Sequence, residues 1–117
     1  MDPYTELAAA LAADGIRCHF QSPGQMVVSG QVGPVWPDRG NSFWVTHAGE
    51  RWHLFTWAPI GYSVPDGAQI VTLCRECMAH GSSAMYVVPN HIVEQFALRE
   101  LSGPETASVY ADMEKLG

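Results

Sequence analysis

The sequence predicts an α+β fold, a four- to five-stranded antiparallel meander with an N-terminal helix and C-terminal helices packed mainly on one face. Apolar and polar residues alternate with period two over residues 16–21, a pattern typical of a half-buried strand. Residues 67–79 instead carry apolar side chains at helical spacing. Short turn signals join consecutive strands, so we expect neighbouring strands to run antiparallel.

Length and charge limit the classes of function. With 117 residues the chain is expected to form a single α+β domain, residues 1–117. Hydrophobic residues make up 47% and charged residues 15%, which excludes disorder by composition. Twelve acidic and six scattered basic residues argue against nucleic-acid partners and anionic membranes, both of which attract basic patches.

The chain also lacks the signals of export. No window approaches the roughly 20 apolar residues of a membrane span. Residues 1–15 have no positively charged start, and Glu6 and Asp14 interrupt their apolar run, so we expect no signal peptide. Three cysteines, an odd number, suit a reducing compartment. These features predict a cytoplasmic protein.

The first elements follow from local signals. Asp2 and Pro3 are typical of the N-cap and first position of a helix, which should end near Ala13. A strand over 16–21, a type II turn over 22–25 and a second strand over 26–31 should follow.

Residues 32–41 contain prolines and glycines at a density that excludes a central strand. This loop holds Trp36 between Pro34 and Pro37, which restrict the backbone and reduce the entropy lost on docking. We therefore expect Trp36 to contact a partner rather than to fill the core.

The segment 42–58 is an aromatic hairpin. A three-residue turn at 47–49, with Gly49 in the left-handed region, would pair Trp44 with Trp52 and place both on one face with Leu54. A two-residue turn would pair Trp44 with His53 and exchange the faces of one strand. The expected register makes both faces apolar, so the face with Trp44, Trp52 and Leu54 needs a second layer, a partner or a ligand.

The C-terminal half is predicted to be mainly helical. Asp66 and Gln69 form a capping-box variant that opens a helix ending near Ala79. Residues 84–88 fit either a short edge strand or an extended loop. A third helix should span about 90–101, and the capping box Ser102–Glu105 should open a last helix.

Cys74, Cys77 and His80 form the pattern CxxC followed by a histidine. A zinc site needs four converging ligands, and a redox CxxC needs its first cysteine at a helix N-terminus. Here Cys74 lies two turns inside the predicted helix, and both cysteines fall at the centre of its apolar stripe. We interpret them as core thiols and keep metal binding as the alternative.

His47, Glu50 and His53 are a second candidate for metal binding or general-base chemistry, since two histidines and a carboxylate near one hairpin end could share a metal ion. The competing interpretation is that His47 is a turn residue and His53 packs on a half-buried sheet face.

The absence of a trusted catalytic pattern favours a non-enzymatic protein-interaction module: an adaptor, a chaperone-like protein or an immunity- or inhibitor-type protein. We expect it to bind a protein partner, to form a homodimer, or both, through Trp36, Trp44, Trp52 and Leu54. No cofactor is expected. A small metal- or ligand-binding protein using the histidine or cysteine set is the alternative.

Overall fold

A computed structural model describes residues 3–22, 25–29, 42–48, 50–56, 58, 60–80 and 86–114, with the backbone only for 19–22, 25–29, 42–43 and 113–114. It confirms the α+β class and the antiparallel meander. The elements run in the order α1 (Pro3–Ala13), β1 (Arg17–Ser22), β2 (Gln25–Ser29), β3 (Ser42–Ala48), β4 (Arg51–Phe55), β5 (Gly61–Val64), η2 (Gly67–Gln69), α2 (Ile70–Ala79), α4 (Asn90–Gln95), β6 (Arg99–Glu100) and α5 (Gly103–Glu114). Within these ranges no helix is long and apolar enough to cross a membrane.

The strands form one sheet in chain order, β1 to β6, with every neighbouring pair antiparallel. Four of these strands match the expected meander, and β5 and β6 extend it. The backbone at Gly61 in β5 lies against the Phe55 ring, and a Cβ atom there would be 2.5 Å from Phe55 Cε1. Glycine therefore allows β5 to pass this buried ring.

The third helix is shorter than predicted. α4 ends at Gln95, and Ala97 adopts a φ of +52°, which is incompatible with a continuing right-handed helix. The chain then pairs with β5 as β6, where an extension of α4 was expected. Of the segment 84–88, the described residues 86–88 form no strand, and the other two lie outside the described residues.

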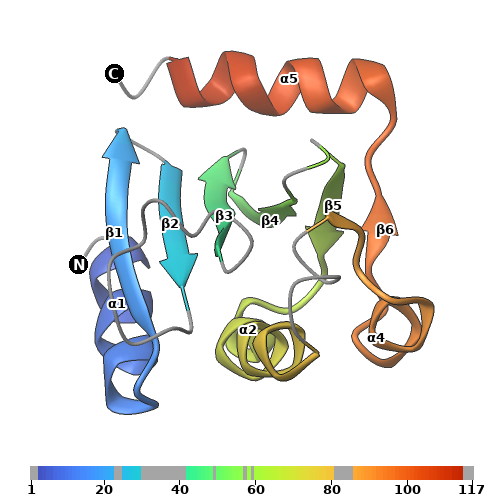
Figure 1. Cartoon of the computed structure of the whole chain (residues 1–117). Coiled ribbons are helices and arrows are strands. Elements are labelled where there is room, and N and C mark those ends of the chain that lie inside the picture. The colour runs from blue at the N-terminus through green and yellow to red at the C-terminus, as the bar shows by residue number, and fades with distance from the viewer. Residues whose placement is uncertain are drawn as a thin grey trace.

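Helices cover both faces of the sheet (Figure 1). α1, α2 and α4 pack on one face, and their core joins Leu11, Ile70 and Ile92 to the sheet residues Val45 and Leu54. α5 crosses the opposite face, where Val109 packs with a smaller apolar cluster. In Figure 1 the sheet lies between α5 and the pair α2 and α4.

α1 is tied to the rest of the domain at both of its ends. Near its start, the His47 backbone N–H donates a hydrogen bond to the Tyr4 hydroxyl at 2.6 Å. The Tyr4 and Trp52 rings pack edge to face, with their centres 5.5 Å apart. Near its end, Asp14 forms a bidentate ion pair with Arg75 of α2. That pair is exposed and adds little stability, so the buried contacts hold the helix.

The hairpin register differs from the prediction. Trp44 pairs with Phe55, and Ala48 pairs with Arg51, so two residues form the turn where three were expected. Glu50 takes the left-handed conformation, with a φ of +63°. The predicted pairing of Trp44 with Trp52 is wrong, and the two tryptophans point to opposite faces of the sheet.

Candidate binding cleft

A cleft of about 240 Å³ lies between the sheet and α5. Its volume is below the 300–1,000 Å³ typical of pockets that enclose a drug-sized molecule. It is lined by Ala48, Arg51, His53, Ser63, Arg99, Leu101, Glu105, Ser108, Val109 and Asp112. The lining is thus mostly polar or charged, in contrast to the apolar core on the other face of the sheet.

The sheet contributes a polar row to this cleft. His53 of β4 pairs with Ser63 of β5, and Ser63 pairs with Arg99 of β6. Paired residues in antiparallel strands place their side chains on the same face, so the three side chains stand in a line across the sheet. Arg51 lies two residues before His53 and therefore projects from the same face.

α5 presents a matching polar stripe. Glu105, Ser108, Val109 and Asp112 line the cleft, and their spacing of three and four residues places them on one side of the helix. A helix that packs on a sheet normally turns an apolar stripe toward it. Here Val109 is buried against the sheet, while polar neighbours face the polar row.

Two polar atoms at the base of the cleft have no hydrogen-bond partner. His53 and Ser63 are 5% and 4% exposed, and both His53 Nδ1 and Ser63 Oγ are unpartnered. Buried polar atoms are nearly always satisfied in native proteins. Since Ser63 Oγ bonds to no group, the pair lacks the nucleophile–base hydrogen bond of an activated serine.

Burial and the nearby positive charges favour the neutral form of His53. Burial lowers the pKa of His53, and the positive charges of Arg51 and Arg99 lower it further, together with His47. Glu105 opposes this shift more weakly. Arg51 and Arg99 thus disfavour a positive charge on His53, and Glu105 offsets them only in part.

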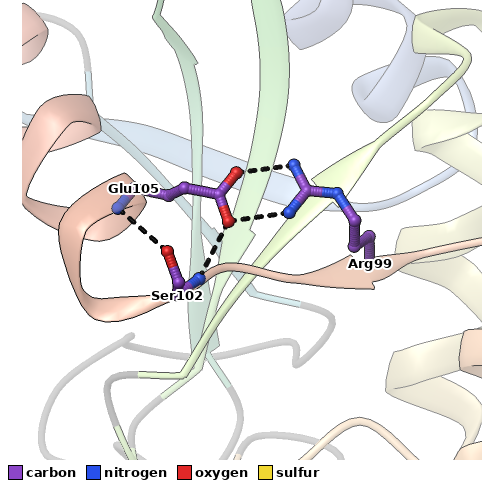
Figure 2. A network of polar contacts seen from close by, with 3 residues as sticks. All are labelled: Arg99, Ser102 and Glu105. Carbon is purple, nitrogen blue, oxygen red and sulfur yellow. Dashed lines mark hydrogen bonds and ion pairs between the residues drawn. The ribbon is translucent and has the colours of Figure 1, made fainter.

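Arg99 and Glu105 form the rim at the start of α5 (Figure 2). Arg99 Nη1 and Nη2 contact the two Glu105 carboxylate oxygens at 2.7 Å each. The Ser102 N–H donates to Glu105 Oε1 at 3.1 Å, and the Glu105 N–H donates to Ser102 Oγ at 3.2 Å. The predicted capping box is thus present in both directions.

These contacts also fix the ionisation of Glu105. The Arg99 guanidinium and the Ser102 backbone lower the pKa of Glu105 to about 2, so the carboxylate is ionised at neutral pH and neutralised by Arg99. The network joins β6 to the first turn of α5 (Figure 2).

The four residues predicted to bind a partner do not share one surface. Trp44 is half-buried on the α5 face, and Trp52 is half-buried on the opposite face beside Tyr4. Leu54 is 1% exposed within the core, so it is inaccessible in the monomer. Trp36 lies outside the described residues. The role of Trp36, Trp44 and Trp52 in binding stays a prediction.

The two candidate metal sets are not assembled. Cys74 and Cys77 are buried in the apolar stripe of α2, as predicted. His80 is exposed, and the centre of its ring lies 5.1 Å from the centre of the His91 ring. Burial raises the pKa of Cys77 to about 12 and that of Cys74 well above its usual value. Among the described residues, no three His, Cys, Asp or Glu side chains lie close enough together to hold a metal ion.

His47 and His53 are separated by the sheet itself. His47 pairs with Trp52, whereas His53 lies one residue further along β4, so their side chains project from opposite faces. Glu50 is exposed in the turn between them. The predicted cluster of His47, Glu50 and His53 is therefore wrong, and His53 belongs to the cleft.

Sequence reasoning missed most of the cleft. Ser63 lies in β5, which the sequence did not predict as a strand, and Arg99 lies where a helix was expected. One signal was present: on the last helix, Glu105, Ser108 and Asp112 share a face with Val109. A polar stripe interrupted by one apolar residue indicates a helix face that is only partly packed against the rest of the protein and partly open to solvent.

The chain matches no protein-family model, and comparison with curated proteins and with solved structures gives no significant match.

Proposed function

We propose that this protein is a non-enzymatic protein-interaction module, of the adaptor, chaperone-like or inhibitor type, that receives a polar group of its partner in the cleft beneath α5. One observation carries the proposal: His53 and Ser63 line the same cleft, and each has a buried polar atom, His53 Nδ1 and Ser63 Oγ, without a hydrogen-bond partner. A buried polar atom without a partner destabilises a protein by about 1–3 kcal/mol. A ligand that supplies hydrogen bonds to both atoms recovers this free energy on binding.

The dimensions and the rim support a macromolecular partner. A volume of about 240 Å³ is small for a cofactor, since pockets that enclose a drug-sized molecule typically measure about 300–1,000 Å³. Arg51 and Arg99 are exposed at the rim, and Tyr110 packs on Phe55 beside the cleft while remaining 39% exposed. Arginine and tyrosine are the residue types that dominate binding energy at protein interfaces.

Selection from a displayed library of random peptides tests this proposal. We expect the immobilised protein to enrich peptides that share one polar residue, and Ser63→Ala together with Arg51→Gln to abolish capture. Arg17→Gln is the matched control, because Arg17 is an exposed arginine of β1 outside the cleft lining. Peptides that bind the cleft variants as well as the native protein would contradict the proposal.

We also propose a homodimer and a cytoplasmic location as working expectations. One observation favours self-association: Tyr86 and Val87 are adjacent and more than half exposed, at 53% and 51%. Sedimentation velocity at micromolar concentration should then show a dimer that the double variant Tyr86→Ser, Val87→Ser dissociates. A monomeric native protein would refute self-association without affecting the cleft.

A further inference from the structure

Resting on the proposed function, we propose that the group received by the cleft is a carboxylate, from either an acidic side chain or the C-terminus of the partner chain. The base of the cleft offers a Ser63 hydroxyl and a His53 imidazole nitrogen, each capable of donating a hydrogen bond and each unpartnered. Arg51 supplies a guanidinium from the same face of β4. Hydroxyl, imidazole and guanidinium donors together are suited to a carboxylate.

The charges around His53 favour an anion. Arg51 of β4, Arg99 of β6 and His47 of β3 disfavour a positive charge on His53. Glu105 of α5 favours that charge, but its effect is weaker. Asp112 of α5 also lines the cleft. A carboxylate entering beside His53 is therefore attracted by the guanidinium of Arg51, whereas an ammonium group would be repelled by it.

The cleft already shows how it holds a carboxylate. Glu105 sits at the rim with its carboxylate in a bidentate contact with Arg99 and accepts a third bond from the Ser102 N–H (Figure 2). Arg99 is thus committed to an internal carboxylate, and Arg51 is the guanidinium left for an incoming one. This division assigns recognition to Arg51, His53 and Ser63, with Arg99 in a positioning role.

Carboxylate binding must then be linked to protonation of His53. A negative charge beside the imidazole raises its pKa, and by reciprocity a protonated His53 binds the carboxylate more tightly. Aspartate and glutamate side chains stay ionised above about pH 5. We therefore expect the affinity for a carboxylate to rise as the pH falls from 7.5 to 5.5.

The experiment uses three small probes on the intact protein, followed by NMR: N-acetyl-glutamate amide, its neutral isostere N-acetyl-glutamine amide, and N-acetyl-glycine as a C-terminal mimic. The imidazole resonances give the pKa of His53, and His91, exposed on α4, serves as an internal reference. We expect the glutamate probe to bind about fivefold more tightly than its glutamine isostere, since charge-assisted hydrogen bonds are stronger than neutral ones. We also expect it to raise the pKa of His53.

Variants separate recognition from a merely structural role. Arg51→Gln should remove the preference for glutamate over glutamine, whereas Arg51→Lys should keep part of it and Arg17→Gln all of it. Preference for N-acetyl-glycine over the glutamate probe would assign the C-terminus as the source. Equal binding of the charged and neutral probes in the cleft would refute the carboxylate but leave the proposed function intact. Shifts outside the cleft, or no binding by any probe, would contradict both.

Discussion

Replacing Ser63 with alanine should stabilise the unliganded protein. The Ser63 hydroxyl is 4% exposed and has no hydrogen-bond partner, so the folded state carries its full desolvation penalty. Such an unsatisfied group destabilises by about 1–3 kcal/mol, and alanine removes it while leaving the Cβ atom in place. With an unfolding entropy of about 2.1 cal/mol/K per residue, a chain of 117 residues gains about 4 °C in melting temperature per kcal/mol.

Differential scanning calorimetry and urea unfolding at pH 7.5 measure this change directly, and Ser102→Ala is the matched control. The Ser102 hydroxyl accepts a hydrogen bond from the Glu105 N–H at the start of α5, so the same substitution should lower stability by about 1 kcal/mol. The two serine variants should therefore shift the melting temperature in opposite directions. A Ser63→Ala protein that is less stable than native would refute the reasoning, because the hydroxyl would then have a satisfied role in the fold.

Three further predictions concern stability and reactivity. Because the pKa of His53 is lowered in the folded protein, the unfolded chain binds a proton at a higher pH than the folded chain does. The free energy of unfolding should therefore be constant above about pH 7 and decline as the pH falls below about 6.5. His53→Gln should flatten that decline in urea titrations at several pH values. Gly61→Ala should destabilise by about 1–3 kcal/mol, because the new methyl group would overlap a buried ring; unchanged unfolding would show that this site relaxes freely. Cys74 and Cys77 should react with a thiol reagent at pH 8 only on unfolding, while the half-exposed Cys18 reacts first; rapid native labelling of all three would contradict their burial.

The sequence predicts the parts of this fold that depend on neighbouring residues. The helix Pro3–Ala13 and the buried stripe of α2 follow from spacing alone. The capping box of Ser102 and Glu105 forms in both directions, as predicted. Asp66 is an N-cap, as predicted, but it caps the short 3₁₀ helix Gly67–Gln69 through the Ala68 N–H, and α2 begins only at Ile70. Each involves partners within three residues, where local geometry leaves few alternatives.

Long-range pairing was harder to predict for a physical reason. Gly49 suggested a three-residue turn, yet Glu50 takes the left-handed conformation and shifts the register, which moved Trp44 to the face opposite Trp52. The cleft depends further on β5 and β6, since Ser63 and Arg99 reach His53 only through their pairing. No local sequence pattern predicts that β4, β5, β6 and α5 bring their polar side chains together in one cleft.

The most direct test of the binding cleft is a map of amide chemical shifts in the isotope-labelled protein, recorded with and without a peptide selected by it. Binding in the cleft predicts that the largest shifts fall in residues 51–53, 61–63, 99–101 and 105–112, on the α5 side of the sheet. Shifts clustered instead around Tyr4, His47 and Trp52 would place the interaction on the opposite face and contradict the account.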